Sequence, residues 1–323
     1  MSAEELSRAL TSKPFLTSGG IETYLLFLQG VPLREFCAFE LVGDETAWSA
    51  MERSFLRPIA EAAAAGGFGF ITDCLVWRAS RDYVDRLGHA AVGVAGVNQR
   101  LVARMRRSID EWRAAGGERA RACPVVLAAD LGPRGDGYAV GAGGPVPVDA
   151  AYGYHVEQVR ALADADVDLL VALTMTSVNE ALGVVRAARE QRLPVLVSPT
   201  VETDGSLPDG SALGDFVARV DEATGGYPVG YIVNCAHPAH LEPTLRAAAD
   251  AGAPWLRRLH GLRTNASRKS HAELDEATEL DRGDIDDLVR QMKALKDRYG
   301  FTILGGCCGT DAEHLRAIVE HCV

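Results

Sequence analysis

The sequence predicts a single-domain α/β fold of the (β/α)8 TIM-barrel class over residues 1–323. Short β-rich apolar segments alternate with helical segments about eight times along the chain, which is the pattern of a closed parallel barrel. No Gly/Ser-rich linker or change of composition divides the chain. An open doubly wound sheet is the alternative, but the first expected strand-to-helix turn has Gly19-Gly20 without the full dinucleotide-binding glycine pattern.

In the first half of the chain, the expected elements follow from apolar runs, helical spacing and terminal glycines. Asp44 is a suitable N-cap, and Gly66-Gly67 a suitable end, for a helix whose apolar residues recur at helical spacing. A stretch rich in Gly and Pro at 138–147 is expected to be irregular. The expected elements are a strand at 15–17, a helix at 44–65, a strand at 68–72, a helix at 96–115, a strand at 124–129, a helix at 149–165 and a strand at 168–173.

The second half continues the alternation and ends in a strand, a glycine-rich turn and a helix. A long polar loop is expected at 263–282, and its basic pair Arg268-Lys269 is either a solvated face or a clamp for carboxylate or phosphate. The expected elements are a helix at 177–191, a strand at 194–198, a helix at 213–223, a strand at 229–233, a helix at 240–251, a strand at 255–259, a helix at 284–299, a strand at 301–304 and a helix at 311–322.

The carboxyl ends of all strands in such a barrel lie on one face, where barrel enzymes place their active sites. Segments that are far apart in the sequence are therefore expected to meet there. These segments are Ser18-Gly19-Gly20, Asp73, Asp130, Thr174, Thr200, Asn234-Cys235 and Cys307-Cys308.

The composition narrows the choice of partners. A net charge of −11 argues against nucleic acid and anionic membranes, because both need basic patches. No run approaches the roughly 18 apolar residues of a membrane span, and the N-terminus lacks the basic flank of a signal peptide. Seven cysteines without disulfide-like spacing favour a reducing cytoplasm. We therefore expect a cytoplasmic enzyme of small molecules, and a homo-oligomer is compatible with the sequence.

Two adjacent cysteines near the C-terminus carry the strongest chemical signal. Cys307-Cys308 lie between Gly305-Gly306 and Gly309, after an apolar strand. Adjacent side chains of an extended strand point to opposite faces, so both thiols can face one metal only if the backbone turns, which these glycines permit. Cys235, at the end of the expected strand 229–233, is the third candidate ligand. The alternatives are buried thiols or a strained vicinal disulfide. The other cysteines have no partner motif and are expected to be small buried hydrophobes: Cys37, Cys74, Cys123 and Cys322.

Three thiolates on one metal favour zinc and restrict its chemistry. Zinc binds thiolates at about 2.3 Å in tetrahedral sites, and three protein ligands leave one position open. The resulting complex has a formal negative charge and is a poor Lewis acid for hydrolysing water. It can still bind an incoming thiol and hold it as a thiolate near neutral pH. Such a thiolate can attack a methyl group on a sulfonium or quaternary nitrogen, a reaction that depends more on positioning than on acid/base groups.

Several motifs resemble those of the zinc-dependent homocysteine S-methyltransferase family, over nearly the whole chain. They are Gly305-Gly-Cys-Cys-Gly-Thr310, Val233-Asn-Cys235, Gly19-Gly-Ile-Glu-Thr23, Leu131-Gly-Pro-Arg-Gly-Asp136 and Thr200-Val-Glu-Thr-Asp-Gly-Ser-Leu-Pro-Asp-Gly210. The resemblance implies a (β/α)8 barrel with zinc on Cys235, Cys307 and Cys308 and the homocysteine sulfur in the fourth position. It also implies methionine formation with S-methylmethionine, S-adenosylmethionine or betaine as donor. The chain has no room for the methylfolate and cobalamin domains of larger members.

Two positions depart from the pattern of that family. Ser18 stands where the family has Asp at the first strand end, and Leu173 stands where it has a Glu that helps to hold the substrate amino group. Losing such charge-assisted contacts costs about 2–5 kcal/mol in binding. Either Glu22, Asp73 or Asp130 compensates, or the acceptor is a thiol other than homocysteine. The residues expected to bind substrate are Ser18, Gly19, Gly20, Glu22, Trp77, Leu173, Thr174 and Asn234.

Some side chains allow a second interpretation. His237 and His240 follow Cys235 and could extend the metal cluster, although capping a loop or donating a hydrogen bond to a metal ligand is the simpler role. Trp77 either packs in the core or forms an aromatic wall for a cationic donor, to which cation–π contact contributes about 2 kcal/mol. Three tyrosines share that ambiguity: Tyr138, Tyr152 and Tyr154.

Two other classes of function stay open from the sequence alone. Gly305-Gly306 could cradle phosphate in a barrel enzyme without a metal. The two missing carboxylates allow a non-catalytic zinc- or thiol-binding barrel. The segment 265–276 also departs from the family pattern and is a candidate specificity loop.

Overall fold

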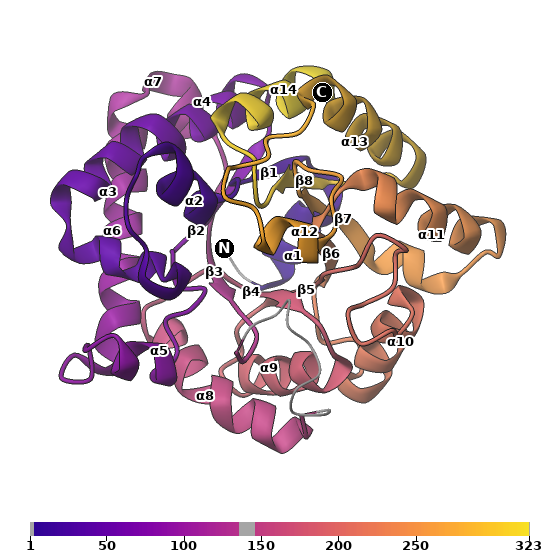
Figure 1. The fold of residues 1–323 in the computed structure, drawn as a ribbon, viewed down its shortest axis with the longest axis horizontal. Helices are drawn as coiled ribbons and strands as arrows, with labels where there is room; N and C mark the ends of the chain where they lie inside the picture. The colour runs from indigo at the N-terminus through magenta and orange to yellow at the C-terminus, as the bar shows by residue number, and fades with distance from the viewer. Residues whose placement is uncertain (1–2, 136–145, 323) are drawn as a thin grey trace.

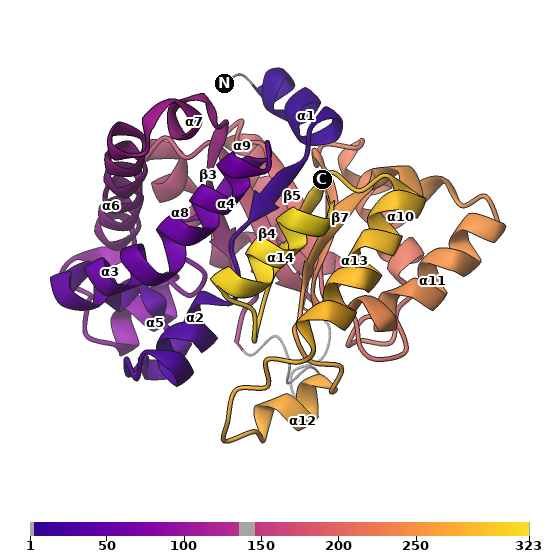
Figure 2. The same cartoon turned by 90° about the horizontal axis from the view of Figure 1, so that it is seen from above.

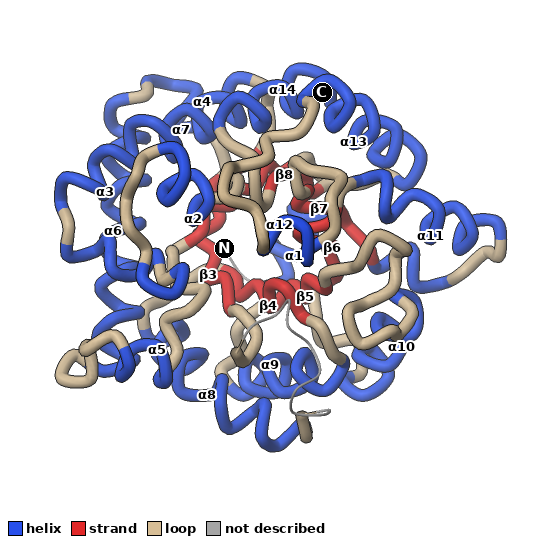
Figure 3. Tube along the Cα trace, viewed as in Figure 1, coloured by secondary structure: helices blue, strands red, loops and turns tan. Residues whose placement is uncertain are grey.

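Eight parallel strands form a closed barrel in this computed structural model, which describes residues 3–135 and 146–322. Each strand pairs with its neighbours in sequence, and the first strand pairs with the last through Phe15↔Ile303 and Leu16↔Leu304. Figures 1 and 3 show the ring of strands enclosed by helices. The (β/α)8 barrel prediction is therefore confirmed. The strands are β1 Phe15–Thr17, β2 Gly69–Asp73, β3 Val125–Leu131, β4 Leu169–Met175, β5 Val195–Pro199, β6 Gly230–Ala236, β7 Leu259–Thr264 and β8 Ile303–Gly306.

The helices follow the strands around the outside of the barrel, with several short ones added. The α-helices are α1 Ala3–Ser12, α2 Ile21–Thr23, α3 Glu45–Met51, α4 Arg57–Ala65, α5 Arg81–Arg86, α6 Gly93–Ala115, α7 Gly117–Ala122, α8 Val148–Asp164, α9 Val178–Glu190, α10 Leu213–Thr224, α11 Pro238–Asp250, α12 His271–Asp275, α13 Ile285–Tyr299 and α14 Ala312–Cys322. Wider or tighter turns occur at Tyr24–Leu28, Arg34–Phe36, Ala38–Gly43, Glu52–Leu56 and Pro254–Arg258. None of the described helices combines the length and apolar character that crossing a membrane requires.

The boundary signals predicted for the helix at 44–65 are correct. The Asp44 side chain accepts a hydrogen bond from the backbone N–H of Ala47, as an N-cap does, and Gly66 follows the last residue of α4. A π-helical turn, Glu52–Leu56, lies between α3 and α4. The irregular stretch expected at 138–147, together with Tyr138, lies outside the described residues except for its last two positions.

Two apolar layers hold the barrel together. Strand residues such as Val171 and Leu196 fill the interior, and residues on the outer faces of the strands pack against the helices. Helix α1, which was not expected from the sequence, inserts Leu6 and Leu10 into the interior cluster. It closes the end of the barrel opposite α12 (Figure 2). Cys37, Cys74, Cys123 and Cys322 are free and buried, as predicted.

The seventh strand was predicted in the wrong place. The expected strand at 255–259 is a 3₁₀ helix, Pro254–Arg258, and β7 follows it. Pro254 favours this conformation because its ring fixes φ at a helical value. Trp255 packs its indole on Gly214, where an added Cβ would lie 2.5 Å from the indole Nε1. Trp255 therefore anchors this 3₁₀ helix on α10 instead of forming part of a strand.

The true strand β7 has a weak sequence signal because a glycine lies within it. An added Cβ at Gly261 would lie only 1.7 Å from the carbonyl oxygen of Ile303 on the neighbouring strand. The two strands can approach this closely only because residue 261 is a glycine. Glycine has a low β propensity, so it weakens the strand signal in the sequence. As a consequence Arg263, which was expected to begin a polar loop, lies within a barrel strand.

Candidate metal centre and substrate cavity

Three cysteine sulfurs meet at the carboxyl ends of β6 and β8. The Sγ of Cys307 lies 2.8 Å from the Sγ of Cys235, which lies 3.4 Å from the Sγ of Cys308. All three sulfurs lie within 4.8 Å of one another. Cys235 is buried, and the other two are partly exposed. The fold thus brings together the three residues that the sequence singled out as metal ligands.

Local backbone geometry aims these side chains. Cys235 has a φ of 56°, in the left-handed region that non-glycine residues rarely adopt, and the register between β6 and β7 shifts at this point. Thr174, at the end of β4, has a φ of 61°. Such residues cost about 1–3 kcal/mol each and persist where the surroundings hold them in place.

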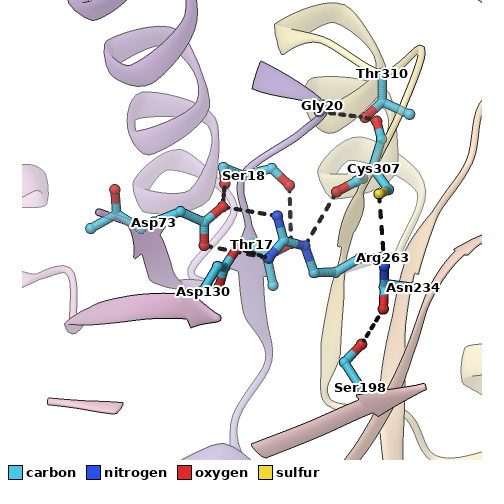
Figure 4. Close-up of polar contacts among 12 residues, drawn as sticks. Thr17, Ser18, Gly20, Asp73, Asp130, Ser198, Asn234, Arg263, Cys307 and Thr310 are labelled. Atoms are coloured by element: carbon cyan, nitrogen blue, oxygen red, sulfur yellow. Dashed lines mark hydrogen bonds and ion pairs between the residues drawn. The ribbon is translucent and has the colours of Figure 1, made fainter. Parts of the chain in front are cut away.

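Asn234 supplies much of that restraint. Its Oδ1 accepts hydrogen bonds from the backbone N–H of Thr174 at 2.9 Å and from Ser198 Oγ at 2.7 Å, and its Nδ2 donates to Thr174 Oγ1. Its Nδ2 also lies 4.0 Å from Cys307 Sγ (Figure 4). Asn234 therefore joins β4, β5 and β6 behind the sulfurs.

The glycines around the cysteine pair are needed mainly because a side chain at these positions would clash with neighbouring atoms. Gly305 and Gly306 belong to β8 and have no positive φ, so they do not form the turn expected from the sequence. An added Cβ at Gly305 would lie 1.8 Å from Thr17 Oγ1. The turn occurs at Gly309, with a φ of 78°. An added Cβ at Gly20 would lie 2.4 Å from the Cys307 carbonyl oxygen, so only glycine allows this close contact.

The thiol cluster is suited to a metal cation. The hydrogen bond to Cys235, followed by burial, raises the pKa of Cys307 to about 12, and its sulfur neighbours raise the pKa of Cys308 as well. Three thiolates this close together are therefore unfavourable without a cation between them. Metal–sulfur bonds of about 2.3 Å in a tetrahedron place the sulfurs about 3.8 Å apart. The observed separations reach that value with shifts of about 1 Å or less.

A cavity of about 450 Å³ opens above the cysteines. Among the described residues its lining includes six carboxylic acids and only two arginines. The predicted site residues on its wall are Gly19, Gly20, Glu22, Trp77, Leu173, Thr174, Cys235, Cys307 and Cys308. Ser18 and Asn234, also predicted to bind substrate, do not line it and lie directly behind Asp73 and Cys307.

Two wall residues have notable polar groups. Burial raises the pKa of Glu22 to about 7. Trp77 lies on the cavity wall, and no described residue provides a hydrogen-bond partner for its indole Nε1. Tyr152 and Tyr154 lie away from the cavity, where they donate hydrogen bonds to Glu190 and Asp82. Of the aromatic candidates that the structure describes, Trp77 alone lines the cavity.

An arginine crosses the floor of the cavity. Arg263 Nη2 donates to Asp73 Oδ2 and Nη1 to Asp130 Oδ2, both at 2.8 Å, and all three side chains are buried (Figure 4). Ser18 Oγ also donates to Asp73 Oδ2. Burial, and then the charge of Asp73, raise the pKa of Asp130 well above its usual value. Sequence reasoning missed Arg263 because β7 was placed too early, although a lone Arg after an apolar alternation was the available signal.

A segment at 265–283 covers one side of the cavity mouth and contains the unexpected helix α12 (Figure 2). Ser270 and Glu273 form a reciprocal capping box at its start. The ring of His271 hydrogen-bonds through Nε2 with the Cys235 carbonyl oxygen at 2.8 Å. This segment is therefore tied directly to the strand that carries a cysteine.

The basic pair of this segment is paired with acids. Arg268 forms an ion pair with Asp287, and Lys269 Nζ lies 3.1 Å from Asp281. Neither residue lines the cavity. The arrangement agrees with the interpretation of a solvated loop face rather than an anion clamp.

The two histidines after Cys235 have structural contacts. His237 is the N-cap of α11, with Nδ1 accepting a hydrogen bond from the backbone N–H of Ala239 at 3.2 Å. His240 Nε2 lies 2.9 Å from the Arg268 carbonyl oxygen. Neither joins the cysteine cluster within the described chain. The capping role expected for His237 is therefore confirmed.

Comparison with solved structures agrees with the barrel fold. The metallated form of the homocysteine methyltransferase MmuM from Escherichia coli matches with a TM-score of 0.70 and 19% identity, covering 99% of each chain. Its oxidized form matches with a TM-score of 0.69 and 20% identity, covering 95% of this chain and 94% of the other. No curated protein gives a significant sequence match. The family model described as homocysteine S-methyltransferase matches residues 46–322, so the chain belongs to the homocysteine S-methyltransferase family.

Proposed function

We propose that the protein transfers a methyl group from an onium donor to the thiol of homocysteine, held on a zinc ion, and so forms methionine. The observation that carries this proposal is the cluster of Cys235, Cys307 and Cys308 beside a cavity at the carboxyl face of the barrel. Family membership supplies the reaction class and the acceptor. Zinc and the donor class rest on the chemistry of the site.

An all-sulfur ligand set fits an acceptor thiol better than a water molecule. Zinc bound there would lower the pKa of a coordinated thiol and keep it nucleophilic near neutral pH. The protein would hold the three cysteine sulfurs on one side of the acceptor thiol, and the cavity wall would enclose the other side of the acceptor. Asn234 and the contact of Gly20 with Cys307 fix the sulfurs, because both restrain the backbone that bears them.

The cavity wall suits a cationic methyl donor. On this wall, Asp275 and Glu279 add negative charge, Glu22 adds a carboxyl group whose pKa burial raises to about 7, and Trp77 and Phe27 add aromatic surface. Onium groups bind aromatic faces and carboxylates, whereas a neutral donor gains little from either. A direct displacement at the sulfurs would depend mainly on the alignment of the two substrates.

Two measurements on one preparation test the proposal. The protein is purified anaerobically and its metal content determined by mass spectrometry, with one zinc per chain expected. Methionine formation is then followed with homocysteine and, in turn, S-methylmethionine, S-adenosylmethionine and betaine. A protein that keeps three reduced cysteines but retains no zinc would overturn the proposal.

The remaining outcomes separate the alternatives. Methyl transfer to other thiols but not to homocysteine would assign the same chemistry to a different acceptor. Zinc retention and thiol binding without methylation of any thiol in a broad panel would indicate a non-catalytic barrel. Phosphate binding at Gly305-Gly306 with unligated cysteines would support the phosphate hypothesis, but the missing space at Gly305 disfavours it.

A further inference from the structure

The two arginines that line the cavity differ in their partners. Arg263 binds both Asp73 and Asp130, whereas Arg78 forms no ion pair with any carboxylate in the described part of the chain. Arg78 Nη1 donates a hydrogen bond to the backbone carbonyl oxygen of Glu35 at 2.6 Å, while the Glu35 carboxylate pairs with Arg86 at 2.8 Å. A guanidinium has five N–H donors. Most of the donors of Arg78 are therefore available to a ligand.

The free edge of the Arg78 guanidinium is accessible. Arg78 is partly exposed and lines the cavity. Its Nε and Nη2 have no hydrogen-bond partner among the described residues, and neither atom is buried, in contrast to the indole Nε1 of Trp77. Nε and Nη2 form the edge through which Arg258 binds the two carboxylate oxygens of Asp221. A carboxylate that enters the cavity can bind Arg78 in the same way.

Three contacts hold this guanidinium in place. It lies 4.8 Å from the ring centroid of Trp77 and 5.2 Å from that of Tyr83, and the hydrogen bond to the Glu35 carbonyl fixes its other edge. Tyr83 is itself held, because its hydroxyl donates to the carbonyl oxygen of Gly135 at 3.3 Å. A side chain that is already ordered loses little conformational entropy when a ligand binds.

The charge of the cavity explains why a carboxylate group needs Arg78. Six carboxylic acids line the cavity, and the other lining arginine, Arg263, is already bound to two of them. A substrate carboxylate would be repelled by this wall unless a positive charge met it. The planar edge of an arginine binds a carboxylate through two parallel hydrogen bonds. A phosphate would bring still more negative charge into an acid-lined cavity.

The contact with Trp77 relates Arg78 to the methyl donor rather than to the acceptor. The acceptor sulfur is expected at the cysteines, beside Arg263, whose Nε lies 3.4 Å from the carbonyl oxygen of Gly306. Trp77 is part of the wall proposed for the onium group. A guanidinium 4.8 Å from that indole would repel a methyl donor that is only positively charged. A carboxylate on the same molecule replaces this repulsion by an ion pair.

From these contacts we propose that Arg78 binds the carboxylate of the methyl donor and so selects donors that are zwitterions. The inference rests on the proposed methyl transfer and narrows its donor from onium compounds in general to sulfonium amino acids and betaines. The carboxylate accepts hydrogen bonds from Nε and Nη2, and the onium group lies against the aromatic and acidic part of the wall. Arg78 thus contributes to specificity and takes no part in breaking or forming a bond.

Turnover by the zinc-loaded protein, with homocysteine as acceptor, tests the proposal. S-methylmethionine, S-adenosylmethionine and glycine betaine are each compared with their own carboxamide, which keeps the onium group but has no carboxylate. For the donor that the protein uses, the wild type is expected to show at least tenfold higher kcat/KM with the carboxylate. Arg78→Gln is expected to reduce that ratio to within about threefold, by raising the KM of the carboxylate form and not that of the amide.

Arg86→Gln is the matched control. The Arg86 guanidinium lies 4.5 Å from the centroid of the same Tyr83 ring, but it pairs with Glu35 and does not line the cavity. This variant is expected to keep the wild-type ratio. Arg78→Lys keeps the charge without the planar edge, so it should recover part of the ratio that Arg78→Gln loses. The KM of homocysteine is measured for all four proteins and is expected to stay unchanged.

Several results would overturn the proposal. Equal wild-type kcat/KM for a donor and its amide would do so even if Arg78→Gln failed to fold. An equal loss for both forms in Arg78→Gln would indicate a structural role, and a change confined to the KM of homocysteine would assign Arg78 to the acceptor. Methylation that ignores the donor carboxylate would remove this inference and leave the methyl transfer intact, whereas no methylation by any of these donors would remove the proposed function itself.

Discussion

Replacing Arg263 by methionine is the most direct test of the buried ion cluster. Methionine keeps much of the side-chain length but removes all donors to Asp73 and Asp130. The variant leaves two buried carboxylates without their shared cation, and removing one partner from such a pair typically costs about 3–5 kcal/mol. We expect the free energy of unfolding to fall by about that amount at pH 8.

The loss should depend on pH in a definite direction. Arg263 lowers the pKa of Asp130, so its removal raises that pKa further above the unfolded value. An acid whose folded pKa is raised destabilises the folded state increasingly as the pH rises from the unfolded pKa of about 3.9 to the folded pKa, and this penalty is absent below the unfolded pKa. The difference between the variant and wild type should therefore be smaller at pH 5.5 than at pH 8.

Equilibrium unfolding in urea, followed by tryptophan fluorescence and circular dichroism at both pH values, measures these differences. Arg258→Met is the control, because Arg258 pairs with Asp221 at 2.7 Å but is 30% exposed. It should cost about 1 kcal/mol or less, because the remaining acid can be hydrated. A loss below about 1 kcal/mol for Arg263→Met, or a loss that grows as the pH falls, would refute the reasoning.

Two further changes test the metal site. Cys308→Ser should reduce retained zinc at least tenfold after dialysis against a weak chelator, whereas Cys322→Ala, a change of a buried cysteine on α14, should retain it. Gly20→Ala should weaken zinc retention because its Cβ would lie 2.4 Å from the Cys307 carbonyl oxygen, whereas Gly43→Ala meets nothing within 4 Å. Unchanged zinc in Cys308→Ser, or equal effects of the two glycine variants, would contradict the respective prediction.

Most of the fold could be predicted because a repeating unit gives a repeating signal. Apolar β-rich runs, helical spacing and caps such as Asp44 report local preferences, and each unit needs little knowledge of the rest. The prediction failed where tertiary contact decided the outcome. Trp255 packs on Gly214, and Gly261 packs on β8. Neither contact can be predicted from a short stretch of sequence, because the partners are far apart in the chain.

The residues of the candidate site likewise differ in whether the sequence could predict them. The cysteines carry a distinctive chemistry and lie at strand ends, so their convergence followed from the barrel prediction alone. Arg263 has no such signature, because most arginines are exposed. The sequence predicted Asp73 and Asp130 as site residues because each lies at the end of a strand. That one arginine binds both of them becomes visible only when the register of β7 is known.

The contact of Ser18 with Asp73 predicts that an aspartate at position 18 could replace the aspartate at position 73, because the two side chains meet at adjacent strand ends. Ser18 follows β1, Asp73 ends β2, and these strands are paired neighbours. Ser18→Asp alone would place a third acid beside Asp73 and Asp130 around one Arg263, so we expect a marked loss of stability. Ser18→Asp with Asp73→Asn restores two acids to one arginine and should recover much of it, with a coupling energy of about 1–3 kcal/mol. Ser18→Asn controls for size, and its effect should show no comparable coupling to Asp73→Asn. Additive losses within about 0.5 kcal/mol in the urea-unfolding cycle would mean that charge does not explain why serine occupies this position.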